Sequence, residues 1–369
     1  MRRLSNSMLT IQVPGKLMIA GEFAVLEPHH NLAVMAVNRF IEVTIAKSER
    51  NLISLEKFQL TDLQWDFEEN QVTIRSADNR VNFVQEAMTV ACMYLEENAI
   101  PLTHFSMQVN SDLDDKGTGK KYGLGSSAAV VVGVITAILQ HHLYDKPDPS
   151  LVFQLAAISH VKAQGNGSGA DVAASTFGGI LNYASFQAEW LRTQYKQANS
   201  IMELLHMDWP YYQVKPIALS EDVHLCIGWT GSPASTGNLV ERILRLRTSK
   251  PTAYQAFLQS SEAAVMMFLN GLENNDFTAI KQGIKQNRAA LVTVGKEAHT
   301  ELETTVIKTL CDLAEEFGGA AKQSGAGGGD CGIAFMPSAE SAKKLAEAWR
   351  QQGIIPLDLL PYPNGAKAI

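Results

Sequence analysis

Apolar and polar positions in the first part of the chain alternate in ways that predict both strands and helices. Segments rich in β-branched residues, separated by polar turns, are typical of strands; we expect strands at 10–13, 40–46, 71–75 and 105–110. Apolar residues that recur every three or four positions indicate helices instead. We expect these helices at 81–95, 128–143 and 149–163.

After residue 218 the periodicity is mostly helical. We expect helices at 239–247, 254–272, 277–294, 301–317 and 339–352. Strands are expected at 223–229 and 331–335, whereas the aromatic segment 190–212 has no period and is expected to be irregular. Strands and helices mix without regular βαβ alternation, so the sequence favours an α+β fold. The change in composition predicts two domains, 1–217 and 218–369.

Composition and charge narrow the classes of protein. The 369 residues carry a net charge of -7, which offers no basic surface to nucleic acid. We expect no membrane span, because the longest apolar run, 128–139, falls short of the roughly 18 residues that a span requires. The first residues lack the apolar core of a signal peptide. These features predict a soluble cytoplasmic protein.

The four cysteines do not suggest a metal site. Cys92, Cys226, Cys311 and Cys331 are scattered along the chain without the spacing of metal ligands. Two disulfides are compatible with their number, but free thiols are the expectation for a reducing compartment.

Three glycine-rich loops, 117–127, 165–169 and 325–329, suggest close approach of backbone to a ligand. Each loop alone is compatible with a tight turn, but glycine costs backbone entropy and one turn needs only one. In the first loop, the run from Gly123 to Ala128 opens a helix. Unobstructed N–H groups at a helix start bind anions, commonly phosphate. Lys120 and Lys121 precede this run and can neutralise phosphate charge.

Two familiar phosphate motifs do not fit these loops. A Walker loop requires glycine at the position of Asp114. GLGSSA, at 123–128, fits the loose GxGxxA dinucleotide pattern, but the following segment is one helix with no second strand ending in an acid. A Rossmann domain is therefore disfavoured.

Three segments, in this order, resemble the three motifs of the GHMP kinases: PGKLMIAGEFA at 14–24, GLGSSAA at 123–129 and SGAGGGDCG at 324–332. The resemblance covers most of the chain. It implies an N-terminal domain like domain 2 of ribosomal protein S5 and a ferredoxin-like C-terminal domain, with ATP and a small-molecule acceptor between them. It also implies Mg²⁺ near Ser127. The residues expected to hold ATP are Lys120, Lys121, Gly123, Leu124, Gly125, Ser126, Ser127, Ala128 and Gly327.

The resemblance also implies two catalytic residues. In mevalonate-type members an Asp in an SG-x-D segment is the proposed base, and it pairs with the lysine of the first motif. Asp171 and Lys16 occupy these positions. An Asp after a glycine loop is also typical of a helix cap, and that interpretation stays open. Those members place a second Mg²⁺ ligand, a Glu, where this chain has His160, which on an apolar helix is more typical of a packed core residue.

The acceptor is suggested by two serine-containing segments, 164–175 and 229–236. They look like the branch of the family whose acceptor already carries a phosphate, and we expect Ser168, Ser232 and Ser235 to bind it. The resemblance then implies ATP-dependent conversion of 5-phosphomevalonate to 5-diphosphomevalonate. Such an acceptor is largely ionised near neutral pH, so two roles stay open for Asp171: removing a proton from the acceptor or orienting it. Mevalonate or another small alcohol as acceptor, an ATP-dependent decarboxylase and a non-catalytic ligand sensor are the alternatives.

Overall fold

Two long antiparallel strands form the centre of the fold. The structure is a computed structural model that describes residues 8–218, 223–232 and 236–369. Strand β1 (Leu9–Ala20) pairs with β2 (Asn31–Lys47), and its register shifts between Pro14 and Gly15. Such a bulge absorbs the Pro-Gly step without ending the strand. The strand expected at 10–13 is therefore longer than its β-branched stretch, because pairing with β2 continues past the bulge.

These two strands belong to a large mixed sheet. Within the described residues its order is β13-β1-β2-β6-β3-β4-β5, and β7 pairs with both β2 and β8. Neighbouring strands are antiparallel except β3 and β6, which are parallel. The other strands are β3 (Leu52–Leu55), β4 (Leu60–Glu68), β5 (Gln71–Ile74), β6 (Phe105–Ser111), β7 (Ile180–Ala184), β8 (Gln213–Ile217) and β13 (Lys367–Ala368).

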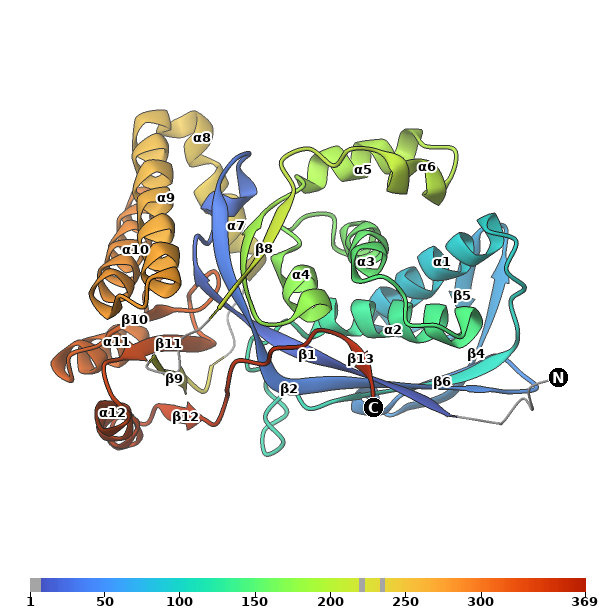
Figure 1. Cartoon of the computed structure of the whole chain (residues 1–369), viewed down its shortest axis with the longest axis horizontal. Coiled ribbons are helices and arrows are strands. Elements are labelled where there is room, and N and C mark those ends of the chain that lie inside the picture. Colours follow the sequence, from blue (N-terminus) through green and yellow to red (C-terminus); the bar gives the residue numbers. More distant parts are fainter. Residues whose placement is uncertain (1–7, 219–222, 233–235) are drawn as a thin grey trace.

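Helices cover one face of this sheet in two layers (Figure 1). The inner layer contains α1 (Asn82–Glu97), α2 (Ser126–Leu143), α3 (Pro149–Gln164) and α4 (Ala170–Phe177). The outer layer contains α5 (Ala188–Gln197) and α6 (Ile201–His206). The expectation that 190–212 is irregular is wrong for these two helices. Single 3-10 turns lie at Ala24–Leu26, Glu56–Phe58 and Asn79–Val81.

Helix α2 is as long as a membrane span but packs inside the protein. Among the described residues it is long and apolar enough to cross a membrane by length and composition, with 18 residues and a mean hydropathy of 1.5. Uncharged residues at both of its ends extend the apolar run 128–139. However, 67% of the helix is buried inside the protein. Its apolar surface is therefore used in packing the core between α1, α3 and the sheet.

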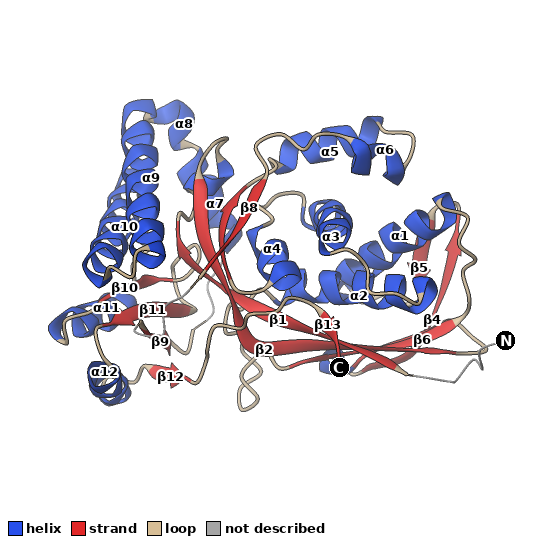
Figure 2. Cartoon of the chain, in the orientation of Figure 1, coloured by secondary structure: helices blue, strands red, loops and turns tan. Residues whose placement is uncertain are grey.

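The C-terminal part has its own four-stranded antiparallel sheet (Figure 2). The strand order is β10-β11-β9-β12. Its strands are β9 (His224–Trp229), β10 (Ala320–Gln323), β11 (Cys331–Met336) and β12 (Ile355–Leu357). Its helices are α7 (Thr236–Leu244), α8 (Leu246–Ser249), α9 (Pro251–Glu273), α10 (Phe277–Glu297), α11 (Thr305–Glu316) and α12 (Ala339–Gln351). Two sheets with separate helical layers confirm the α+β class.

The end of the chain returns to the first sheet (Figure 1). Strand β13 pairs with β1, and the N–H of Tyr362 donates to the carbonyl of Ala36 at 2.9 Å. The N–H of Ala366 donates to the carbonyl of Ser175 in α4 at 3.0 Å. The tail thus packs on the N-terminal part although the domain limits 1–217 and 218–369, which stay a prediction, assign it to the second domain. The four cysteines are free thiols, as expected.

Candidate active site

Lys16 connects the first glycine motif to the second. It lies on β1 just after the bulge and is 9% exposed. Its Nζ donates to the carbonyl of Gly123 at 2.9 Å, and its backbone N–H donates to the carbonyl of Leu124 at 2.9 Å. A Cβ added to Gly125 would lie 2.9 Å from Cγ and Cε of Lys16. The glycine at 125 therefore leaves the room that the lysine stem needs.

The second motif ends in an open helix N-terminus. Gly125 is the N-cap of α2 and has a φ of 76°, a conformation that favours glycine. Within the described ranges no side chain caps this helix. The N–H groups of Ser126, Ser127 and Ala128 therefore point out of the first turn without an intrahelical acceptor, and the helix dipole adds positive potential there. This arrangement suits a phosphate group.

His160 lies beside this helix start. It is 3% exposed, its ring centroid is 5.4 Å from that of Phe83, and its Nε2 lies 3.4 Å from Oγ of Ser127. The expected core histidine is thus buried, but it also contacts the predicted metal-binding serine and lines the cavity described below.

Asp171 lies in the first turn of α4, where the helix dipole favours a negative charge. The N-cap of α4 is Gly169, and the hydroxyl of Ser168 accepts from the N–H of Ala170 at 3.3 Å. Asp171 Oδ1 accepts only from the adjacent N–H of Val172 among the bonds of the described residues. The cap interpretation therefore does not describe Asp171, whose carboxylate lines the cavity.

The third glycine loop, 325–329, lies against the first, 117–127. A Cβ on Gly123 would lie 2.6 Å from Cγ of Asp330, so only glycine allows this approach. The thiol of Cys331 donates to the carbonyl of Tyr122 at 3.2 Å. The N–H of Ser324 donates to the carbonyl of Cys331 at 2.8 Å, which closes the loop at its base.

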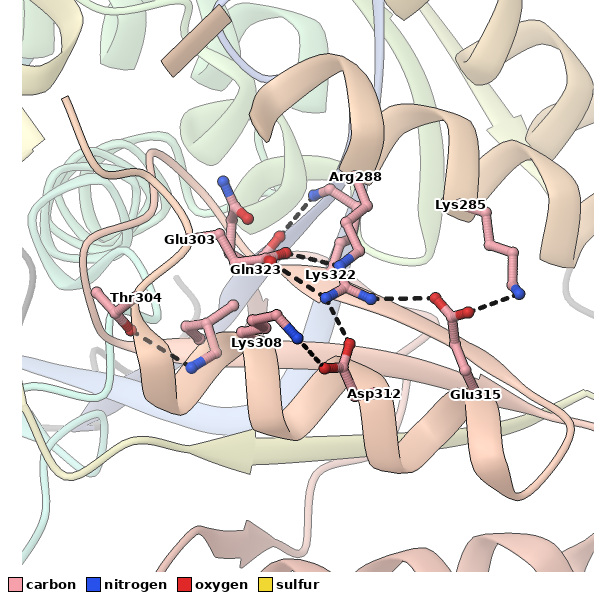
Figure 3. Close-up of polar contacts among 10 residues, drawn as sticks. Lys285, Arg288, Glu303, Thr304, Lys308, Asp312, Glu315, Lys322 and Gln323 are labelled. Atoms are coloured by element: carbon pink, nitrogen blue, oxygen red, sulfur yellow. Dashed lines mark hydrogen bonds and ion pairs between the residues drawn. The ribbon is translucent and has the colours of Figure 1, made fainter. Parts of the chain in front are cut away.

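Arg288 of α10 holds the segment that supports this loop from the far side. Figure 3 shows its guanidinium pointing toward Glu303, Asp312 and Glu315. The Arg288–Glu303 pair is bidentate, at 2.6 and 3.1 Å, and both side chains are largely buried. Burial alone lowers the pKa of Arg288, but the hydrogen bonds to its carboxylates raise that pKa above its ordinary value. The carbonyl of Leu302, next to Glu303, accepts from the N–H of Gly328 at 2.8 Å.

The three loops and α4 surround one cavity of about 730 Å³. Of the residues expected to act in catalysis or to bind ligands, this cavity is lined by Lys16, Lys121, Gly123, Leu124, Gly125, Ser126, Ser127, Ser168 and Asp171. Lys120 turns away and donates to the carbonyl of Gly231 at 3.0 Å. Ala128 is fully buried, and neither Gly327 nor Ser232 lines the cavity. Ser235 lies outside the described residues.

The cavity is also lined by charged residues that had no expected role, and two of them are Arg247 and Glu22. Arg247 lines the cavity and forms an ion pair with Glu27, which also accepts from the hydroxyl of Tyr254 at 2.6 Å. Glu22 also lines the cavity and forms an ion pair with Lys322. Glu22 stands inside the first motif, which was a usable signal, whereas nothing near Arg247 or Lys322 marks them.

The donors around the helix start suit a magnesium ion that is carried by a nucleotide. The described residues contain no cluster of three or more His, Cys, Asp or Glu side chains that could hold a metal. The Ser127 hydroxyl and the Asp171 carboxylate supply oxygen donors, which Mg²⁺ prefers, and this ion commonly takes few protein ligands beside phosphate oxygens and water. The site therefore fits Mg²⁺ held jointly with ATP phosphates.

Comparison with known families agrees with this geometry. The family described as GHMP kinases N terminal domain matches residues 82–179, and the one described as GHMP kinases C terminal matches residues 268–355. The chain belongs to the GHMP kinases.

Its relatives include phosphomevalonate kinases. The chain is 30% identical to phosphomevalonate kinase of Streptomyces sp. (strain CL190), over 95% of this chain and 96% of that protein. The structure of Streptococcus pneumoniae phosphomevalonate kinase in complex with phosphomevalonate and AMPPNP matches with a TM-score of 0.83, at 26% identity, over 95% of this chain and 99% of that one. A Lin0012 protein from Listeria innocua matches with a TM-score of 0.91, at 35% identity, over 98% and 99%.

Proposed function

We propose that this protein is a phosphomevalonate kinase, which transfers the γ-phosphoryl group of ATP to the phosphate of 5-phosphomevalonate and releases ADP and 5-diphosphomevalonate. The observation that carries the proposal is the placement of Lys16 against the open N-terminus of α2, in a cavity that Asp171 also lines. Phosphoryl transfer requires alignment and charge neutralisation more than covalent chemistry by the protein. The named relatives supply the acceptor. A cytoplasmic location stays a prediction.

In this reaction an acceptor phosphate oxygen attacks the γ-phosphorus, and the bond to the β-phosphate oxygen breaks. The N–H groups at the start of α2 bind phosphate oxygens of ATP. The Lys16 ammonium, released from the Gly123 carbonyl or shared with it, stabilises charge on the transferring group. Because the acceptor is already ionised, Asp171 orients it and need not remove a proton.

The proposed reaction uses a magnesium ion bound together with ATP. Ser127 and Asp171, which line the same cavity, would hold it, and the ion would supply charge neutralisation on ATP. His160 keeps the Ser127 hydroxyl oriented at the helix start.

The test is ADP release by the purified protein with ATP and Mg²⁺, with 5-phosphomevalonate and mevalonate offered separately. We expect turnover with the phosphorylated acceptor, and loss of that turnover after chelation with EDTA followed by restoration with added Mg²⁺. Turnover with mevalonate alone would contradict the assigned acceptor. Absence of turnover with both would contradict the assigned reaction and favour another acceptor or a ligand sensor.

A further inference from the structure

A buried ion pair joins the first glycine motif to the strand before the third. Lys322, on β10, is fully buried, and its Nζ lies 2.5 Å from Oε1 of Glu22, which is 4% exposed. The two residues are 300 positions apart in sequence. Lys322 Nζ also donates to the carbonyl of Gln323 at 2.5 Å. The pair is thus a buried contact between the N-terminal and C-terminal parts of the protein.

The same Glu22 oxygen also holds the third glycine loop directly. Oε1 accepts from the backbone N–H of Gly325 at 3.2 Å. Gly325 and its neighbours Ser324 and Ala326 line the cavity, as Glu22 does. Since the opposite side of the loop is held through Gly328, the loop is fixed from both halves of the molecule.

Charge explains why this contact is made by a carboxylate and an ammonium. Burial lowers the pKa of Lys322, and the Glu22 carboxylate opposes that change. A buried charge without its partner is strongly destabilising, whereas a buried pair gives little net stability compared with apolar residues. A pair kept at this place is therefore better explained by what it positions than by stability.

We propose that Glu22 is a positioning residue that fixes the third glycine loop relative to Lys16, so that both contact the same nucleotide phosphates. Glu22 follows Lys16 by six residues, beyond the end of β1, and so carries the placement of that strand to Gly325. The inference rests on the proposed function only in taking the cavity as a nucleotide site.

The experiment measures the dissociation constant of AMPPNP with Mg²⁺, without acceptor, for the wild type and for Glu22 variants. We expect Glu22→Ala to weaken binding by about 10-fold or more, because the charged acceptor of the Gly325 N–H is lost. Glu22→Gln combined with Lys322→Met keeps an oxygen in reach of Gly325 without leaving a buried ammonium unpaired, and it should stay within about 3-fold of the wild type. Glu86→Ala is the matched control, since Glu86 pairs with Lys162 at 3.0 Å in a part-buried site and neither residue lines the cavity.

A second variant guards against unfolding. Glu22→Ala leaves Lys322 unpaired, so Glu22→Ala with Lys322→Met removes both charges and should fold while still binding AMPPNP weakly. Wild-type affinity in this double variant would overturn the proposal, as would an equal loss in Glu22→Gln with Lys322→Met or a matching loss in Glu86→Ala. If the wild type binds AMPPNP but does not turn over 5-phosphomevalonate, the proposed function fails while this inference stands.

Discussion

At the scale of single residues, Lys16 is the side chain on which the chemistry depends most. We expect Lys16→Met to lower kcat by about 100-fold or more, because a preorganised cation at the transferring phosphate is removed. ADP release at saturating ATP and 5-phosphomevalonate measures this. Lys116→Met is the control: Lys116 is exposed and pairs with Asp112 at 2.8 Å at the surface. A kcat near that of the control would show that Lys16 is not catalytic.

The size of the kcat loss in an Asp171 variant tests whether Asp171 orients the acceptor or removes a proton from it. We expect Asp171→Asn to lower kcat by about 10-fold, less than Lys16→Met, because the acceptor phosphate needs no base and the amide still occupies the carboxylate's place at the start of α4. General-base catalysis is typically worth about 100-fold or more. A loss of that size in the same ADP assay would therefore identify Asp171 as a base.

Lys16, Ser127 and Asp171 could be predicted because each stands within a short glycine-rich segment. Glu22 and Lys322 could not be paired from the sequence, because the contact joins residues 300 positions apart. Ser168 lines the cavity as expected and Ser232 does not, although both follow glycine. A serine next to glycine indicates a loop, but only the packing of other elements decides which way its hydroxyl points.

At the scale of elements, the contact of the N-cap glycine of α2 with Lys16 can be tested separately from the strain of its left-handed backbone conformation. Gly125→Ala would place a Cβ 2.9 Å from the Lys16 side chain, whereas Gly353, with a similar φ of 74°, has nothing within 4 Å and does not line the cavity. Both substitutions cost about 1–2 kcal/mol of stability, because alanine disfavours the left-handed conformation. We expect similar losses in the free energy of unfolding by urea, but a large fall in kcat only for Gly125→Ala. Equal kcat values would contradict the contact with Lys16.

Elements with a regular apolar stripe were predictable, and those without one were not. Helix α5 buries only Leu191, and its neighbouring aromatic residues pack together, with Trp190 6.0 Å from Trp209 between ring centroids. One buried side chain in ten residues gives a weak signal for a helix. Strand β10 was missed because its sequence, AAKQ, includes Lys322 and Gln323, which are fully buried. Its burial comes from tertiary partners, which local pattern does not contain.

At the scale of the whole molecule, the tail that crosses back to β1 is the feature least visible in the sequence. Gly365 packs so tightly on α4 that an added Cβ would lie 1.8 Å from the carbonyl oxygen of Thr176. Next to this contact, the buried hydroxyl of Ser175 donates to the carbonyl of Pro14 at 2.9 Å, at the bulge of β1. The tail therefore packs against the helix that carries Asp171 and the strand that carries Lys16.

This packing predicts that a change in the tail reaches the active site. We expect Gly365→Ala to lower the free energy of unfolding by about 1–3 kcal/mol, because the backbone must move away from α4. Hydrogen exchange should quicken along β1 at Ile11 and Gln12, the residues that pair with β13, and kcat should fall with it. Gly353→Ala is the control, since Gly353 has nothing within 4 Å and a φ of 74°. It should lose stability without faster exchange in β1. If Gly365→Ala leaves exchange in β1 unchanged, the tail does not hold that strand in place.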